Sequence, residues 1–392
     1  MSSESPHQVW ASDLSPFALK LRSMLDAVGA SYRWLPESGG RAEGLRLFAR
    51  IAWAKARRTA IRFPKMQPLD EYPLVPFVAA TDGQIYYDSS SLAHWLDQTH
   101  PAPAGPLVPS EPGLAFLAAL VDEAFDEFGL YMVHHNRWVL SAATNRAGLR
   151  VAEEFAPVLT RPLARLIGGR FPRRQTRRLP YLFSVAPPGA PPGPAGPLPA
   201  PAGFPATHAL LDEAWQHTLA AMETLLDHQP YLLGERFTLA DASAYGQLSM
   251  NLPDGLAAER LRELAPTTFA WLNRIRAGRH AASRGALAQS ASLGPLLEIV
   301  GQTFVPLMQQ NEAAFLAAHG SGERLFNERA FDAGRSLYDG ELLGRPFRAV
   351  VKTFQVQAWR ELRARFGQLE PAQRPTLPPE TERALEAPLA AN

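Results

Sequence analysis

The chain has 392 residues, which at about 150 residues per domain corresponds to two domains with further segments and excludes a single small module. Hydrophobic residues make up 46% and charged residues 20%, as in ordinary globular proteins, so a chain disordered as a whole is excluded. The 39 Lys and Arg balance 38 Asp and Glu to a net charge of +1, which gives no overall attraction to nucleic acid, and the absence of cysteine excludes disulfides, thiolate metal sites and cysteine nucleophiles.

The first 97 residues are expected to form an α/β domain. A helix should begin at Ser15-Pro16, because serine is a favoured N-cap and proline suits the first turn, and it should end at Gly29. A second helix should follow the cap at Asp88 or Ser89. Four short strands are expected beside these helices, at 8–11, 32–35, 75–80 and 85–87, the last two joined by an Asp-Gly turn.

The remaining residues are expected to be mainly helical. Four prolines mark residues 98–109 as a linker, and an all-helical domain should occupy 110–285. Apolar periodicity predicts its helices near 110–128, 147–167, 206–227, 239–250 and 266–277. The Pro-, Gly- and Ala-rich residues 186–205 predict a flexible loop within it. A helical extension is expected over 286–378, with helices at 295–318 and 346–367, followed by a flexible tail over 379–392.

The first residues of the chain lack the basic and apolar regions of a signal peptide, and no apolar run is expected to be long enough to cross a bilayer. We therefore expect a soluble, cytoplasmic protein.

Five short motifs occur in an order and spacing that resemble the cytosolic glutathione transferases. They are Ser15-Pro16-Phe17 with Lys20 and Arg22, Val75-Pro76, Asp88-Ser89 with Leu92 and Leu96, Thr238-Leu239-Ala240-Asp241, and Pro266 to Trp271. The first motif is similar to that of serine-type and omega-like members. The resemblance covers roughly residues 8–36, 72–140 and 206–280, and it departs at 37–71, 141–205 and beyond 285.

The resemblance implies a thioredoxin-like N-terminal domain that binds glutathione, followed by an all-helical domain with extra C-terminal helices. It also implies that Ser15 binds the glutathione thiol. A free thiol has a pKa near 8.5, so about 3% is thiolate at pH 7, and lowering the pKa by about 2 units requires about 2.7 kcal/mol. A hydroxyl donor and the positive end of a helix together supply that order of energy. The alternative is that Ser15 only caps its helix, with Ser12 close enough to replace it.

The other glutathione contacts are also carried over from the resemblance. Pro76 is expected to follow a cis bond, with the backbone of Val75 bonding the cysteinyl part, although a plain proline at a strand start is the alternative. Asp88 and Ser89 should receive the γ-glutamyl end, or merely cap their helix. Lys65, in competition with Arg62, should meet the glycine carboxylate.

The first helix of the second domain borders the acceptor pocket in this family. Tyr131, His134 and Trp138 share one face at i, i+3 and i+7 spacing, which favours either a pocket wall or core packing. Metal ligands would need closer spacing, such as histidines four residues apart, so we expect no metal site.

Two segments are strongly basic. Residues 41–65 hold eight Lys and Arg against one Glu, and residues 161–178 hold seven arginines. For the first segment the alternatives are an anionic membrane surface, an acidic partner, or charges carried in water. For the second they are a grip on phosphates, which no nucleic-acid motif supports, or a solvated insertion. The solvated interpretation is preferred for both.

The sequence therefore predicts a glutathione transferase-like enzyme in which the thiolate attacks a small, apolar electrophile by conjugation, lyase or isomerase chemistry. Glutathione acts as co-substrate, nucleic acid is not expected as a partner, and the resemblance implies a homodimer. The alternative is a non-catalytic interaction protein with the same fold, which uses its basic segment and extension to bind a partner or membrane surface.

Overall fold

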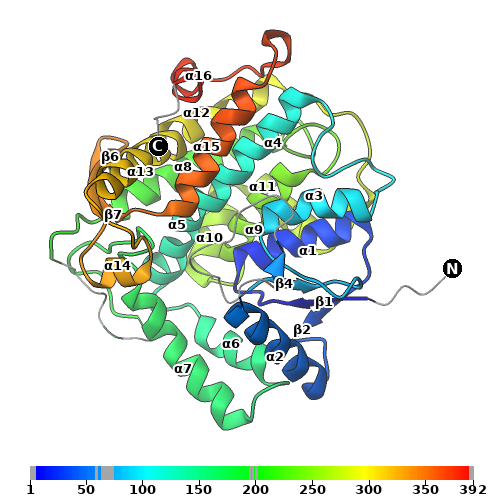
Figure 1. Ribbon diagram of the computed structural model, residues 1–392, viewed down its shortest axis with the longest axis vertical. Coiled ribbons are helices and arrows are strands. Elements are labelled where there is room, and N and C mark those ends of the chain that lie inside the picture. Colours follow the sequence, from blue (N-terminus) through cyan, green and yellow to red (C-terminus); the bar gives the residue numbers. More distant parts are fainter. Residues whose placement is uncertain are drawn as a thin grey trace.

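The computed structural model describes residues 6–57, 61–62, 75–193, 196, 198 and 202–387. Figure 1 shows a small sheet with flanking helices at the N-terminal end of the chain and a larger helical body above it.

The N-terminal domain is built on one mixed sheet in the order β2-β1-β4-β5-β3. Its strands are β1 (His7–Trp10), β2 (Tyr32–Leu35), β3 (Ile61–Arg62), β4 (Phe77–Ala79) and β5 (Ile85–Tyr86). β1 is parallel to β2 and antiparallel to β4, and β4 is antiparallel to β5. β1 and β5 therefore run in the same direction, and the helices that follow them begin at the same edge of the sheet.

Successive side chains of each strand point to opposite faces of this sheet, so both faces carry apolar side chains, and helices cover both. Val9 and Val78 pack with α1 (Pro16–Val28) and α3 (Ser89–Thr99), whereas Trp10 and Phe77 pack against α2 (Arg41–Arg57). In Figure 1, α1 and α3 lie above the sheet and α2 lies below it. The expected α/β domain is confirmed.

The helical domain begins with a long, nearly continuous helix. It runs through α4 (Pro112–Ala124), the π-helical turn η1 (Phe125–Gly129), α5 (Leu130–His135) and a second π-helical turn, η2 (Asn136–Leu140). The other elements of this domain are α8 (His208–Leu226), α9 (Leu239–Leu248), η3 (Ser249–Asn251), α10 (Gly255–Leu264), α11 (Pro266–Arg276) and η4 (Arg279–Ala282). α9 begins with a capping box formed by Thr238 and Asp241, the ends of the fourth motif.

The insertion between α5 and α8 forms a helical hairpin. The single helix expected near 147–167 is wrong, because the chain turns after α6 (Ala147–Phe155) and starts again as α7 (Arg161–Arg177). Pro157 and Pro162 flank the turn, and proline disfavours a continuing helix. Gly148 and Gly168 let the two helices approach closely, since a Cβ at either glycine would meet the other helix's backbone.

The C-terminal extension packs on the helical domain. Its helices are η5 (Ala291–Leu293), α12 (Gly294–Gln302), α13 (Phe304–Gly320), α14 (Glu328–Asp332), α15 (Thr353–Gly367), η6 (Pro371–Gln373) and α16 (Pro379–Glu386). α12 contacts α8 and α4, and α15 lies beside α4 (Figure 1).

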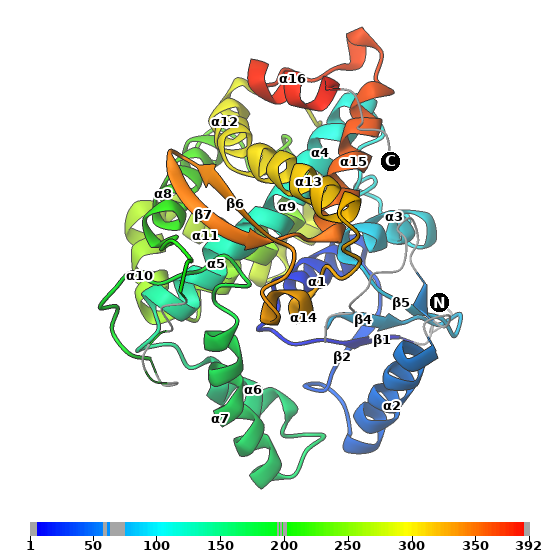
Figure 2. The ribbon, with the colours of Figure 1, turned by 60° about the vertical axis from the view of Figure 1, so that its left-hand side comes forward.

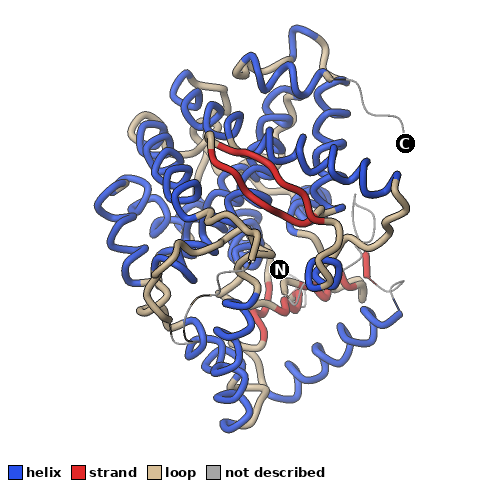
Figure 3. The backbone as a smooth tube through the Cα atoms, turned by 90° about the vertical axis from the view of Figure 1, so that its left-hand side faces the viewer, coloured by secondary structure: helices blue, strands red, loops and turns tan. Residues whose placement is uncertain are grey.

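Two expectations for this extension are wrong. Residues 346–351 are not helical: β6 (Leu337–Leu342) and β7 (Arg345–Val350) form a hairpin, turned by Leu343 and Gly344 at positive φ (Figures 2 and 3). Phe347 and Val350 are both buried, and phenylalanine and valine are residue types that favour strands. The flexible tail is also partly ordered, because α16 buries Leu385 against the extension.

Among the described residues, one stretch, 291–320, is long and apolar enough by length and composition to cross a membrane, although no such run was expected from the sequence. The mean hydropathy of its most apolar part is 1.2, and 56% of that part is buried inside the fold. The stretch forms η5, α12 and α13.

Candidate functional site

The strand register brings three sequence-predicted groups to one edge of the sheet. Trp10, at the end of β1, pairs with Phe77, at the start of β4, so the Ser15 loop and the Val75-Pro76 turn lie at the same edge. β5 ends there too, because it runs parallel to β1, and Asp88 and Ser89 follow it directly. Residues more than 70 positions apart in the sequence thus converge where α1 and α3 begin.

Ser15 is the N-cap of α1. Its backbone is extended, and its Oγ accepts a hydrogen bond from the Ala18 N–H at 3.3 Å. The hydroxyl is only partly buried, and among the described residues no acceptor takes its proton. The cap role is therefore present, and the same hydroxyl remains able to donate to a ligand beside the positive end of α1.

The bond between Val75 and Pro76 is cis, as the resemblance implies. The bond between Leu35 and Pro36 is cis as well, which the sequence analysis did not anticipate. Lys65, the candidate cation for a ligand carboxylate, lies outside the described residues.

Asp88 caps α3 in a left-handed backbone conformation, with φ of 77°. Its Oδ1 accepts from the Ser91 N–H at 2.7 Å, and within the described chain its second oxygen has no hydrogen bond. Burial raises the pKa of Asp88, although the Ser91 N–H opposes this rise. An ammonium group placed at the second oxygen would stabilise the buried, ionised carboxylate of Asp88. The neighbouring Ser89 hydroxyl and the first amides of α3 suit an anion.

A buried lysine ties the starts of α1 and α3 to the helical domain. Lys20 is 0% exposed, and its Nζ lies 2.5 Å from an Asp122 oxygen, 2.6 Å from an Asp126 oxygen and 2.8 Å from the Ser90 Oγ. Asp122 also accepts a hydrogen bond from Ser243 of α9. Burial alone would lower the pKa of Lys20, but the two carboxylates outweigh it and raise that pKa.

Further acids surround this lysine and make the interior between the domains strongly carboxylate-rich. Burial raises the pKa of Asp126 to about 7, and it raises the pKa values of Glu123 and Glu127 as well. Asp122 and Asp126 are four residues apart, and this spacing indicates that both lie on the same face of a helix. It did not reveal Lys20 as their partner.

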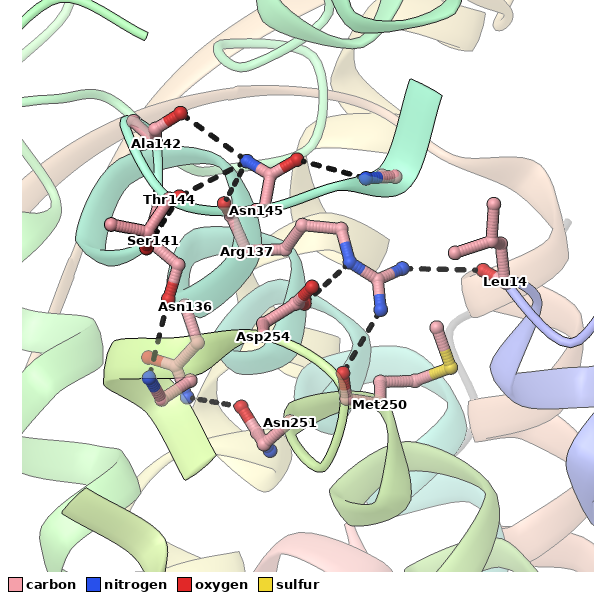
Figure 4. Close-up of polar contacts among 12 residues, drawn as sticks. Leu14, Asn136, Arg137, Ser141, Ala142, Thr144, Asn145, Met250, Asn251 and Asp254 are labelled. Atoms are coloured by element: carbon pink, nitrogen blue, oxygen red, sulfur yellow. Dashed lines mark hydrogen bonds and ion pairs between the residues drawn. The ribbon is translucent and has the colours of Figure 1, made fainter. Parts of the chain in front are cut away.

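The loop before Ser15 is held by a second buried ion pair, drawn in Figure 4. Arg137 of η2 donates from Nε to Asp254 Oδ2 at 2.6 Å and from Nη2 to the Met250 carbonyl at 2.9 Å. Its Nη1 reaches the Leu14 carbonyl at 3.5 Å. Arg137 thus connects the helical domain with the residue immediately preceding Ser15, and no sequence motif had pointed to it.

The insertion also reaches this loop, through Glu154 of α6. Its Oε1 accepts from the Asp13 N–H at 3.1 Å, and its Oε2 accepts the Ser12 hydroxyl hydrogen bond. Ser12 is therefore engaged as a donor, which weakens it as a replacement for Ser15. Burial raises the pKa of Glu154 to about 7, although the Ser12 hydroxyl opposes the rise.

Replacing Glu154 by glutamine is expected to change how stability depends on pH. Native Glu154 holds its proton up to about pH 7, whereas the unfolded side chain releases it near 4.5, so this group makes the wild type less stable as pH rises through that interval. The variant lacks this loss. Its stability relative to the wild type should therefore increase with pH, by at most about 1.4 kcal/mol per pH unit. Urea unfolding at several pH values measures this, and a constant difference would contradict it.

The three residues predicted for an acceptor pocket are all buried. Trp138 packs on Phe171 of the insertion, with ring centroids 5.8 Å apart, and His134 bonds Ser184 through Nδ1 at 3.2 Å. Burial lowers the pKa of His134 to about 3, so it is neutral. For these two residues the core-packing interpretation fits their surroundings.

Tyr131 lies beneath the extension. Its hydroxyl accepts from Lys352 Nζ at 2.5 Å and from Gln355 Nε2 at 2.9 Å, and its ring stacks on Phe183 at 5.2 Å. Burial lowers the pKa of Lys352 to about 8, while Glu127 opposes the change. The insertion and the extension thus supply the surroundings of Tyr131, and neither segment belongs to the regions of sequence resemblance.

Comparisons with known proteins identify both domains. The sequence matches the model of the glutathione S-transferase N-terminal domain over residues 10–104 and that of the glutathione S-transferase C-terminal domain over 205–274. No curated protein sequence matches the chain. The two matched regions leave the α6–α7 insertion and the C-terminal extension outside.

Solved structures similar to the chain have low identity. The β-etherase LigF from Sphingobium is 18% identical with a TM-score of 0.41, and the match covers 70% of this chain and 96% of that chain. A glutathione S-transferase from Rhodospirillum rubrum is 17% identical with a TM-score of 0.33, covering 74% and 91%. Another from Pseudomonas fluorescens is 17% identical with a TM-score of 0.32, covering 69% and 94%.

Proposed function

Because the chain belongs to the glutathione S-transferase family, we propose that it is an enzyme that binds glutathione at the sheet edge where α1 and α3 begin and activates its thiol for attack on an electrophile. The observation that supports this most is the convergence of Ser15, the cis Val75-Pro76 turn and Asp88 at that edge.

Each part of glutathione has a chemically suitable group at this edge. The free oxygen of Asp88 suits the γ-glutamyl ammonium, and the Ser89 hydroxyl with the first amides of α3 suits the adjoining carboxylate. The backbone of Val75 suits the cysteinyl amide. The Ser15 hydroxyl, at the positive end of α1, suits the sulfur and favours its thiolate form.

The reaction follows from thiolate chemistry in a chain without cysteine. The thiol gives up its proton, and the sulfur electron pair forms a bond to an electrophilic carbon. In conjugation and lyase reactions the leaving group departs with the electron pair of the bond that breaks. In isomerase reactions the new carbon–sulfur bond breaks again and releases glutathione. No protein thiol is present to exchange disulfides with glutathione. We also propose a cytoplasmic location and a homodimer. Light scattering of the purified protein tests the homodimer, because it measures the mass of the particle in solution.

Replacing Asp88 by alanine is expected to weaken glutathione binding roughly 10- to 150-fold, the effect of losing a charged hydrogen bond worth about 1.5 to 3 kcal/mol. Calorimetric titration measures the affinity. Glu111 offers a matched control, because its side chain caps α4 by accepting from the Gly113 and Leu114 N–H groups, away from the proposed site.

Both variants lose a helix cap, and both should lose comparable stability. Only the Asp88 variant should lose glutathione affinity. Unchanged affinity in a folded Asp88→Ala protein would remove Asp88 from the site, and the failure of the wild type to bind glutathione would favour the non-catalytic interaction protein instead.

A further inference from the structure

Exposed apolar side chains are concentrated on three helices. Of the nine large apolar side chains exposed among the described residues, seven lie on α2, α6 and α7. On α7, Leu163, Leu166 and Ile167 follow the i, i+3, i+4 spacing of one helix face. On α2, Phe48 and Trp53 are each 53% exposed. Single exposed apolar residues are ordinary, but such a concentration marks an interaction surface.

The same helices carry a one-sided charge. α7 contains six arginines between Arg161 and Arg177 and no acidic residue. Arg174 is turned toward Glu328 of the extension, at 3.8 Å, whereas the other five are exposed and pair with none of the described carboxylates. On α2, the sole acid, Glu43, is paired with Arg33 at 2.8 Å and leaves the exposed arginines of that helix uncompensated.

α2 and the α6–α7 hairpin form one end of the molecule. Val158, in the turn between α6 and α7, packs with Leu47 and Ile51 of α2, and Gly44 of α2 lies directly against Val158. α7 turns Ala164, Gly168, Pro172 and Thr176 inward, and most of its other residues are exposed. Figures 1 and 2 show α2, α6 and α7 together at the lower end, below the sheet.

We propose that this end, formed by the exposed sides of α2 and α7, docks on an anionic lipid bilayer. Arginines interspersed with leucine, isoleucine, phenylalanine and tryptophan suit a surface that is negative outside and apolar beneath. Nucleic acid would use the arginines but leave the leucines and isoleucine without a role, so the lipid surface accounts for both sets. The proposal does not depend on glutathione chemistry, because the assay below contains no glutathione.

Co-sedimentation with vesicles tests this. We expect the full chain to bind vesicles of equal parts phosphatidylcholine and phosphatidylserine, and to bind phosphatidylcholine vesicles far less. Binding should fall as salt is added, since the arginines act through a screened field. Reversing three exposed arginines (Arg165→Glu, Arg170→Glu, Arg173→Glu) should lower the partition coefficient at least about tenfold. The charge-matched control reverses Arg262, Arg276 and Arg279, which are exposed on or next to α10 and α11.

The contribution of the apolar side chains to vesicle binding can be tested with a second pair of leucines that is exposed to a similar degree. Leu163 and Leu166 are 42% and 47% exposed, and Leu256 and Leu264 of α10 are 41% and 46% exposed. Replacing the first pair by serine should weaken vesicle binding severalfold, whereas replacing the second pair should leave it unchanged. Equal losses in both pairs, equal binding to neutral vesicles, or binding to duplex DNA without binding to vesicles would overturn the proposal.

Discussion

Replacing Lys20 by methionine is expected to lower the free energy of unfolding by about 3 to 5 kcal/mol, the cost of leaving buried charge without its partner. Lys20 is the cation shared by Asp122 and Asp126, and methionine retains its length without the charge. Both carboxylates would stay buried between the two domains. Urea denaturation of the purified variant measures the loss.

Two further measurements make this prediction specific. The exposed pair of Arg33 and Glu43 provides a control, and Arg33→Met should cost less than about 1 kcal/mol. Burial already raises the pKa of Asp126 to about 7 against the opposing effect of Lys20, so without Lys20 this pKa should rise further. The native variant then takes up its proton at higher pH than the wild type and gains stability relative to it as pH falls. The deficit should therefore shrink as pH falls toward about 7, below which Asp126 is protonated in both native proteins. A deficit that is small, or that grows on acidification, would contradict the assignment.

The second large effect is expected at Arg137. Arg137→Met should also cost about 3 to 5 kcal/mol, because Asp254 stays buried without its cation and the Met250 carbonyl loses a donor. Since Arg137 also bonds the Leu14 carbonyl, the variant should bind glutathione more weakly even at temperatures where it is folded.

Arg260 offers the control for this substitution. It pairs with Asp212 at 2.7 Å, but its side chain is 29% exposed, so Arg260→Met should cost about 1 kcal/mol or less and leave glutathione affinity unchanged. If Arg137→Met unfolded no more easily than Arg260→Met, the buried pair would not hold the loop before Ser15.

The elements that the sequence predicted well are those with local signals. α1 and α3 each have a side-chain cap and an apolar stripe, and both begin within one residue of the expected position. The hairpin of β6 and β7 was missed because Phe347 and Val351 also fit the helical spacing that continues into α15. A short apolar run fits both periods, and the strand is selected by the pairing of β7 with β6, which in turn packs against α13.

The groups around the site were predictable only where they lie in the matched motifs. Ser15, Asp88 and Ser89 follow strands whose order fixes where they meet, so their convergence could be expected from the fold. Glu154 and Lys352 come from segments with no counterpart in those motifs, and their roles depend on tertiary contacts across more than a hundred residues. The sequence left open whether Tyr131 forms a pocket wall or packs in the core, and it could not show that Lys352 and Gln355 of the extension bond its hydroxyl.

Activation of glutathione by Ser15 is tested most directly by the absorbance of the thiolate of bound glutathione as a function of pH, in the wild type and in Ser15→Ala. We expect the wild type to lower the thiol pKa by about 2 units from its free value near 8.5, and Ser15→Ala to return it most of the way, with turnover lost near neutral pH. Removal of a helix cap alone would cost about 0.5 to 2 kcal/mol of stability and leave the curve unmoved. Identical curves in the two proteins would show that Ser15 only caps α1 and would contradict the proposed activation of glutathione.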